Sequence, residues 1–447
     1  MSAGNPTEPL RILAITTAHL FPSQARPTAG IFFANLLRRL RPLVERLVVV
    51  VPTAYIPGFL QRLPRFSFRR KIAYHERWHG LEVFRPPYLS IRSQHHLWFQ
   101  SRSFCMAATP LCLALHRRHD FDLVLGNGFG PPAHTAQYVA KQIHSRSVGW
   151  AIGSDVHTAP HLSDENMRLF RHNIRHCDLV LTTSQALRRN ILDAFPDSKH
   201  VHAFHRGIDL EDLRVCADRA TARAALGLAA DRTYVLTAGD VLCRKGSEEF
   251  YGAFRSLAGR WPGLAAIWIG DGDETANLRR RAQEDGLTDR FTITGSVPRP
   301  EVLRYMRAAD VMAFASHAEG LPNVVMEAMA TGLPTVASDV GGVRAIIEDD
   351  RTGLLVPAQN AAALAIAIER VLAEPAWAGQ AAARGREFIC RYFDVDRNAP
   401  VLVSVLERIA AGGSPEAPFP PCANVPAGST PIDVEKSLRR ATSADCP

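Results

Sequence analysis

Residues 309–357 constrain the fold of this chain more than any other segment. An apolar run at 311–315 predicts a buried strand, and a polar corner at 316–320 follows it. Pro322 then indicates a helix start, because its φ is fixed and its missing N–H is one that a first helical turn leaves unpaired. Residues 335–338 predict a second buried strand. Strand, helix and strand in this order form a βαβ unit and therefore a parallel sheet.

Two carboxylates flank the predicted helix start. Glu319 follows the first strand, at the carboxyl end where ligands bind in open α/β sheets. The backbone N–H groups of residues 321–324 form an anion site at the helix start. Glu327 lies five residues beyond Pro322, roughly 7–8 Å along the helix. Carboxylates accept paired hydrogen bonds from vicinal hydroxyls, so this layout suits a sugar linked to a nucleotide diphosphate.

The full motif is E-G-L-P-N-x-x-x-E-A-M-A-x-G-x-P-x-V-A-S, followed by G-G and T-G-L-L-V-P. It resembles the donor-site motif of the retaining GT-B glycosyltransferases of family 4. The resemblance implies that Glu319 meets the donor sugar's hydroxyls and that Glu327 meets the ribose. The segment between them would offer backbone amides to the diphosphate, and it consists of Gly320, Leu321, Pro322, Asn323 and Val324. Without the motif, Glu327 could equally be a solvated helix carboxylate.

The length of 447 residues exceeds the usual limit for one core, so two domains are expected. The resemblance extends over residues 10–410 and implies an α/β GT-B fold, in which two Rossmann-like domains face each other across a cleft. The predicted parts are an acceptor domain at 1–205, a nucleotide-sugar domain at 206–392, a crossover helix near 393–411 that returns to the first domain, and a tail at 412–447. The tail is rich in Pro, Ala, Ser and Gly and is expected to be disordered.

Apolar runs elsewhere predict further strands, which alternate with helical spacing. The predicted strands lie at 10–16, 46–51, 121–126, 148–152, 179–183, 234–238, 265–269 and 291–297, and the predicted helices at 31–41, 184–191, 278–284, 301–310, 361–372, 381–391 and 401–411.

A cationic loop follows the strand at 234–238. Its sequence G-D-V-L-C-R-K-G resembles the family pattern G-R-L…K-G, in which Arg and Lys hold the donor diphosphate. Lys245 matches the Lys, and Arg244 precedes it. Asp240 stands at the Arg position and replaces a phosphate-binding cation with an anion. Arg244, or Arg206 in the hinge-like H-R-G-I-D turn, could supply the missing cation, or the donor geometry could differ.

Two further turns resemble parts of the family's donor site. Gly270 opens a G-D-G turn, and Val297 ends a G-S-V segment at the position where the family holds the nucleotide base. Asp271 and Asp273 form a D-x-D, but they belong to the G-D-G turn and have no other metal-ligand context. We therefore expect neither an obligatory metal nor another cofactor besides the nucleotide-sugar co-substrate.

The first domain offers two candidate residues. Gly30 lies in a segment that resembles the family's glycine loop, where the backbone approaches the donor phosphate; it could also be a plain loop glycine before a helix. Asp155 belongs to G-S-D-V at the end of the predicted strand at 148–152. This motif resembles one in enzymes that build envelope polysaccharides and exopolysaccharides. Asp155 could orient or deprotonate the acceptor hydroxyl, or it could be a structural cap.

The net charge is +8, and residues 57–102 concentrate cations beside aromatic rings. Such a composition favours an anionic surface such as a membrane that carries a lipid-phosphate acceptor. An ordinary surface with its aromatic residues in the core is the alternative, and nucleic acid is not expected because no reader motif accompanies the segment. The cations are Arg62, Arg65, Arg69, Arg70, Lys71, Arg77, Arg85, Arg92 and Arg102, and the apolar residues among them are Phe59, Leu60, Phe66, Phe68, Trp78, Trp98 and Phe99.

The sequence as a whole predicts a retaining glycosyltransferase that moves a hexosyl group from an NDP-sugar to a saccharide or lipid-linked acceptor. The sequence favours a cytoplasmic protein that is peripheral at the inner face of the membrane. Its eight cysteines have no CxxC spacing, and it shows neither a signal peptide nor an apolar run that could span a bilayer. Two alternatives stay open, a sugar-nucleotide epimerase of the same architecture and a weakly catalytic binding protein, which Asp240 would favour.

Overall fold

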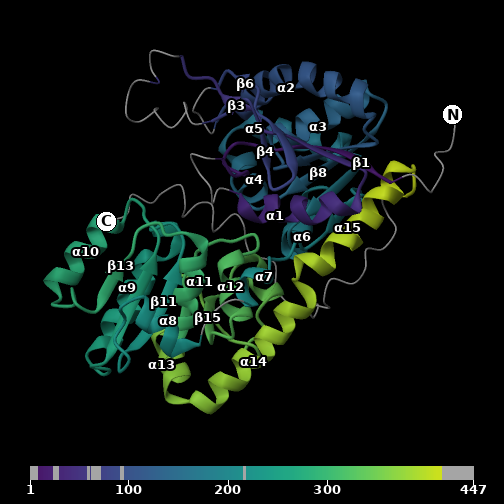
Figure 1. Cartoon of the computed structure of the whole chain (residues 1–447). Coiled ribbons are helices and arrows are strands. Elements are labelled where there is room, and N and C mark those ends of the chain that lie inside the picture. Colours follow the sequence, from purple (N-terminus) through teal and green to yellow (C-terminus); the bar gives the residue numbers. More distant parts are fainter. Residues whose placement is uncertain are drawn as a thin grey trace. The chain divides into compact units, whose positions relative to one another are not determined.

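The computed structural model of the chain describes residues 9–23, 30–57, 61, 72–90, 95–214 and 218–414 (Figure 1). These residues divide into two compact units. The first unit ends at Gly207 and resumes at Val395, and the second runs from Ile208 to Asp394. The corresponding expectations were divisions after residues 205 and 392. Of the predicted tail, residues 415–447 lie outside the described part.

The first unit is built on an eight-stranded sheet with the order β10-β9-β8-β7-β1-β2-β5-β4. All neighbours are parallel except β4 and β5. The strands are β1 (Arg11–Ile15), β2 (Arg46–Val50), β4 (His75–Trp78), β5 (Leu81–Phe84), β7 (Leu123–Asn127), β8 (Arg146–Ala151), β9 (Leu179–Thr182) and β10 (Val201–Ala203); β3 (Thr53–Ala54) and β6 (Pro87–Tyr88) form a separate parallel pair.

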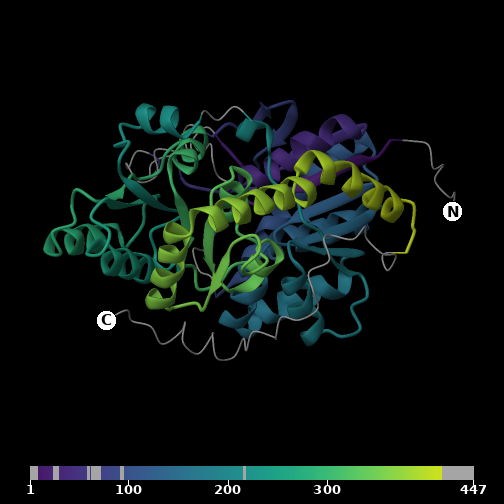
Figure 2. The same ribbon diagram turned by 90° about the horizontal axis from the view of Figure 1, so that it is seen from below.

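Helices cover both faces of this sheet, which is why its inner strands are apolar over most of their length. Ile12 and Ala14 face a core shared with helices α1 and α15, whereas Leu13 and Ile15 face a core shared with α2 and α3. Figure 2 shows α15, in yellow, beside α1, in purple. The helices are α1 (Ile31–Leu40), α2 (Leu97–His119), α3 (Pro131–Gln142), α4 (Ser154–His157), α5 (Asp164–His176), α6 (Gln185–Ala194) and α15 (Val395–Ala410), with 3-10 turns η1 (Arg41–Leu43) and η4 (Ala159–Leu162).

His205 of the first unit predicts a pH dependence of stability. Its ring is buried, and Nδ1–H donates to the carbonyl of Thr183 at 2.8 Å. Burial lowers the pKa of His205 to about 4, so the unfolded chain binds the proton more tightly than the folded one. Stability is then complete above about pH 6.5 and decreases as the pH falls towards 4; between pH 7.5 and 5 the loss is about 2 kcal/mol.

The substitution His205→Asn keeps an amide N–H for the Thr183 carbonyl and removes the titration. When the pH decreases from 7.5 to 5, the unfolding free energy of both proteins should decrease. We expect the decrease to be about 2 kcal/mol smaller in the variant than in the original chain. Urea unfolding at both pH values measures this difference. Equal losses in the two proteins would contradict the prediction, since all other titrating groups are shared.

The second unit has a six-stranded parallel sheet with the order β13-β12-β11-β14-β15-β16. Its strand order reverses between β11 and β14, which makes this pair the topological switch point where α/β sheets bind ligands. The strands are β11 (Thr233–Ala238), β12 (Leu264–Ile269), β13 (Phe291–Ile293), β14 (Val311–Phe314), β15 (Thr335–Ser338) and β16 (Leu354–Val356).

Helices α9, α10 and α13 pack on one core of this sheet, while α11 and α12 contact β11, β14 and β15. The helices of the second unit are α7 (Glu211–Arg214), α8 (Arg219–Ala225), α9 (Ser247–Ala258), α10 (Thr275–Glu284), α11 (Arg299–Ala308), α12 (Asn323–Ala330), α13 (Ala361–Ala373) and α14 (Pro375–Tyr392), with 3-10 turns η5 (Cys243–Lys245) and η6 (Gly341–Ala345). The predicted pair of Rossmann-like α/β domains is therefore confirmed.

Candidate active site

The loops that follow β11 and β14 are bonded to each other at the switch point. The carbonyl of Arg244 accepts the backbone N–H of His317 at 3.0 Å. Gly246 has a positive φ of 78°, and a Cβ at this position would lie 2.1 Å from the carbonyl oxygen of Ala315. Only glycine permits this approach, so Gly246 holds the cationic loop against the end of β14.

Lys245 and Glu319 meet directly across these two loops. The Lys245 ammonium Nζ lies 2.5 Å from Glu319 Oε1, and Ser316 Oγ donates to the same oxygen at 2.8 Å. The two side chains are 22% and 14% exposed, and Ser316 is fully buried. The two residues that the sequence assigns to the diphosphate and to the sugar are thus ion-paired with each other. Ser316, which the sequence analysis did not single out, orients the carboxylate.

The segment between the two acids forms the predicted helix start. Helix α12 begins at Asn323, with Pro322 as its N-cap, one residue later than the sequence pattern predicts. The loop before it is fixed from outside by Gly341, whose φ is 48° and whose added Cβ would lie 1.8 Å from the Glu319 carbonyl oxygen. Gly342 donates its N–H to the same oxygen at 3.3 Å. The N–H groups of the first turn of α12 have no partner within the helix and can bind an anion.

Glu327 is buried on α12, with 5% of its surface exposed. Its Oε1 accepts from Arg299 Nε at 2.9 Å and from Arg299 Nη2 at 2.8 Å. Arg299 begins α11 and also donates to the carbonyl of Asp209 at 3.3 Å. The reading of Glu327 as a solvated helix carboxylate is therefore wrong. Arg299 is a site residue that sequence reasoning missed, because it lies 28 positions before Glu327 and outside every recognised motif.

The G-D-G and G-S-V turns lie side by side. Gly270 has a φ of 144°, and its added Cβ would lie 2.0 Å from the Gly239 carbonyl oxygen. Gly270 also donates its N–H to the Gly295 carbonyl at 3.0 Å. Val297 is half-buried two residues before Arg299, so the proposed base-binding turn leads directly to the Arg299–Glu327 pair.

Asp271 is hydrogen-bonded within the G-D-G turn and to the first residue of α10. It accepts from the Gly272 N–H and from Thr275 Oγ1, both at 2.9 Å, and these bonds lower the pKa of its carboxyl. Within the described residues, no cluster of three or more His, Cys, Asp or Glu side chains could hold a metal. Metal independence stays a prediction.

The cation that Asp240 displaces has two candidate substitutes, and they lie in different units. Asp240 and Arg244 are both exposed on the loop after β11. Arg206 belongs to the first unit, where its guanidinium lies over the Trp150 ring at 5.6 Å from the centroid. Burial lowers the pKa of Arg206 to about 10, and the charge of Asp155 opposes this shift.

The two candidates in the first unit are both engaged locally. Gly30 caps α1 with a φ of 59°, and its added Cβ would lie 2.0 Å from the Leu20 carbonyl carbon, so the glycine is required there by the backbone alone. Asp155 accepts from the N–H groups of Phe129, Ile152 and Gly153 at 2.7–3.1 Å. Burial raises the pKa of Asp155, and these bonds act against it. Its contacts are those of the structural cap, and its acceptor role stays a prediction.

Comparison with known proteins places this geometry in a family context. Residues 218–388 match the family described as "Glycosyl transferases group 1". A protein of Bacillus subtilis with the name "Putative teichuronic acid biosynthesis glycosyltransferase TuaC" is 28% identical over 400 residues. The aligned region covers 88% of this chain and 97% of TuaC. The GDP-mannose-dependent alpha-(1-6)-phosphatidylinositol monomannoside mannosyltransferase of Mycobacterium tuberculosis is 25% identical over 377 residues, 79% of this chain and 93% of the enzyme.

Among solved structures, Anabaena Alr3699/HepE in complex with UDP-glucose superimposes with a TM-score of 0.69 at 18% identity, over 89% of this chain and 99% of HepE. This likeness concerns the fold. The chain is therefore a glycosyltransferase with the GT-B fold, and its match to the group 1 glycosyl transferases spans residues 218–388.

Proposed function

We propose that the protein transfers a hexosyl group from a nucleoside-diphosphate sugar to an acceptor hydroxyl, with retention at the anomeric carbon. The observation that carries this proposal is the Lys245–Glu319 pair at the switch point, beside the start of α12. It places a cation, a carboxylate and a helix N-terminus where an α/β sheet binds its ligand. The UDP-glucose named in the HepE complex and the GDP-mannose named for the mycobacterial relative are donors of this class.

In the proposed mechanism, the donor replaces the internal ion pair. Lys245 leaves Glu319 Oε1 for the diphosphate, and Glu319 then accepts from hydroxyls of the sugar. As the bond between the anomeric carbon and the phosphate oxygen breaks, negative charge grows on the diphosphate. The Lys245 ammonium and the N–H groups at the start of α12 stabilise this charge.

Retention follows from attack on the face that the diphosphate leaves. The acceptor oxygen forms its bond to the anomeric carbon on that face, and its proton passes to the departing phosphate oxygen. No enzyme nucleophile is then required, and Lys245 with the helix start takes the place of an obligatory metal. Both carboxylate oxygens of Asp155 accept backbone N–H groups, and these bonds fix the turn at Ile152–Gly153. The acceptor would bind near this turn.

For the acceptor we propose a saccharide or lipid-linked precursor of a cell-envelope polysaccharide or exopolysaccharide. The names of two relatives support this class, since one refers to teichuronic acid and the other to a mannosylated phosphatidylinositol. A protein acting on such acceptors would work in the cytoplasm, at the inner face of the cell membrane.

A donor screen tests the proposal. Thermal shift against UDP-, GDP- and ADP-sugars identifies the donor, and transfer to a polyprenyl-phosphate or oligosaccharide acceptor is followed by NMR of the anomeric proton. We expect one base class to stabilise the protein and the product to keep the donor's anomeric configuration. If the protein isomerises or hydrolyses the donor when no acceptor is present, it is the sugar-nucleotide epimerase of the alternative hypothesis. Donor binding without turnover would identify the binding protein.

A further inference from the structure

Large apolar side chains are exposed mainly on the first unit. Eight such residues are exposed in the described part of the chain, and only Ile366 belongs to the second unit. Four of the other seven gather around α2 and the β3–β6 pair, and they are Tyr55 (53% exposed), Leu89 (66%), Phe99 (49%) and Met106 (76%). We refer to these four as the α2 patch. Such a cluster on one surface marks an interaction site more often than scattered single residues do.

Hydrogen bonds show that the members of the α2 patch are neighbours. Phe99, Ser103 and Met106 follow the i, i+4, i+7 spacing and so share one face of α2. Ser103 Oγ on that face donates to the carbonyl of Leu89 at 2.7 Å. The N–H of Tyr55 donates to the carbonyl of Tyr88, the residue before Leu89, at 2.6 Å. Figure 1 shows β3 and β6 beside α2.

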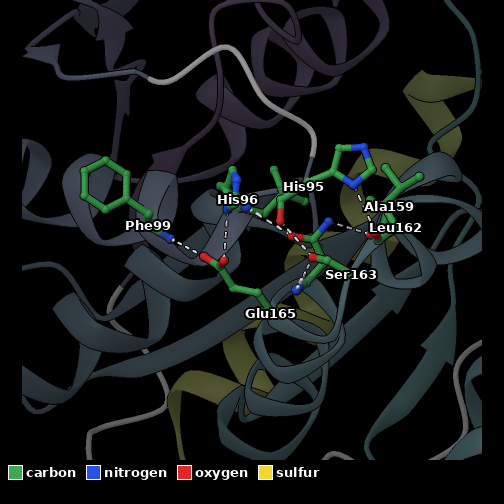
Figure 3. A network of polar contacts seen from close by, with 9 residues as sticks. His95, His96, Phe99, Ala159, Leu162, Ser163 and Glu165 are labelled. Carbon is green, nitrogen blue, oxygen red and sulfur yellow. Dashed lines mark hydrogen bonds and ion pairs between the residues drawn. The ribbon is translucent and has the colours of Figure 1, made fainter.

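The start of α2 is anchored, so the exposure of Phe99 is not that of a loose helix end. Glu165 Oε1 accepts the N–H of Phe99, and Asn166 Oδ1 accepts the N–H of Leu97, both at 3.0 Å. Ser163 Oγ donates to the carbonyl of His95 at 2.7 Å. Figure 3 shows this network, with the Phe99 ring pointing away from Glu165. The first turn of α5 therefore caps α2 and presents the ring outward.

The charge along α2 is mainly positive. Residues 83–119 contain no Asp or Glu, and Arg102, Arg117 and Arg118 are exposed on α2 itself. The neighbouring carboxylate Glu165 is engaged by Phe99 and by His96 Nδ1 at 3.2 Å. In a symmetric dimer with its two-fold axis through the α2 patch, Arg102 would approach its own copy, which disfavours a second copy as the partner.

The composition of residues 57–102 predicts an anionic partner. The structure describes only part of this segment, so the prediction can be examined only there. Its residues 58–60, 62–71 and 91–94 lie outside the described part, and with them most of the expected cations. Arg85 is buried against Glu76, so the expectation that it contributes to a surface is wrong. Trp78 and Trp98 are half-buried and pack against Phe21 and His134. Phe99 and Arg102 are exposed and belong to α2.

We propose that α2 lies flat on an anionic lipid bilayer, with the α2 patch inserted at headgroup level and its arginines on the lipid phosphates. The helix has 23 residues, about 34 Å at 1.5 Å per residue, and no helix in the described residues is long and apolar enough to span a membrane. The surface deepens the proposed function, since it would bring a lipid-linked acceptor to the enzyme, but vesicle binding itself does not require transfer.

The test is co-sedimentation of the full chain with phosphatidylcholine vesicles, with and without one third phosphatidylglycerol, at low and high salt. We expect binding to the anionic vesicles that weakens with salt. The double variant Phe99→Ser/Met106→Ser should lower the partition coefficient about tenfold or more, because it removes the two inserted side chains. Ile366→Ser, a similarly exposed apolar residue of the second unit, is the matched control and should bind as the original chain does.

Charge is tested separately by Arg102→Glu/Arg117→Glu, with Arg304→Glu on α11 as its control. Equal vesicle binding by the patch variants and the original chain would overturn the proposal. So would a dimer that dissociates on Phe99→Ser/Met106→Ser, since the patch would then bind a second copy. Transfer to a water-soluble acceptor should be unchanged in the patch variants. Vesicle binding without any transfer would instead refute the proposed function and leave this surface intact.

Discussion

We expect the substitution Lys245→Ala to lower kcat for sugar transfer by about 100- to 1000-fold, the range seen when one preorganised hydrogen-bond donor to a developing anion is removed. Lys245 is one of only five lysines in the chain, and it lies at the switch point within 2.5 Å of Glu319 Oε1. The substitution removes the cation that the diphosphate needs most when its bond to the sugar breaks. Steady-state rates at saturating donor measure the effect, because donor binding alone would change KM.

The matched control is Lys141→Ala, which removes an exposed lysine on α3 of the first unit and should leave kcat unchanged. A double-mutant cycle with Glu319→Gln adds a sharper criterion. In the donor complex Lys245 has left Glu319 for the diphosphate and Glu319 binds the sugar, so the two residues act on separate groups and their effects on kcat should be close to additive. A Lys245→Ala rate within twofold of the original would contradict the role of this residue.

The strand pattern shows how far sequence reasoning reaches in this fold. The inner strands are covered on both faces, so runs such as 46–51 and 234–238 are apolar at most positions. The positions of both strands are confirmed within two residues. Helix α2 is different, because its sequence contains Pro110, and because Phe99 and Met106 make its outer face apolar too. With apolar residues on both faces, the helical period that would reveal it is lost.

The site shows the same division between local and distant information. A motif of contiguous residues predicts the loop from Glu319 to Glu327, and the structure confirms a helix start between them. The ion partners of the two acids come from other loops, Lys245 from 74 positions earlier and Arg299 from 28. Lys245 could be found because it has a motif of its own. Arg299 has none, and only the folded chain brings it to Glu327.

Arg299 is the residue for which we expect the second large effect. The Arg299 guanidinium makes two contacts to Glu327 Oε1, from Nε and from Nη2, and Arg299→Met removes both. The Glu327 carboxylate that remains is buried, with 5% of the residue exposed. Loss of one partner of a buried pair costs about 3–5 kcal/mol, so the second unit should melt at a lower temperature. If Glu327 binds the donor ribose, an unfixed carboxylate should also raise the donor KM about 10- to 100-fold while kcat changes little, because the ribose is remote from the breaking bond.

Stability alone would not establish that Arg299 positions Glu327, so the decisive readout is selectivity for the ribose. The original enzyme should prefer the ribonucleotide donor over its 2′-deoxy analogue, and Glu327→Gln should lose most of that preference. Arg299→Met should lose it equally, and adding it to Glu327→Gln should change little further. Arg299→Lys, which keeps the charge without the forked geometry, should recover part of it. An Arg299→Met enzyme that melts early but discriminates the two donors as the original does would leave Arg299 with a structural role only, through its bond to the Asp209 carbonyl.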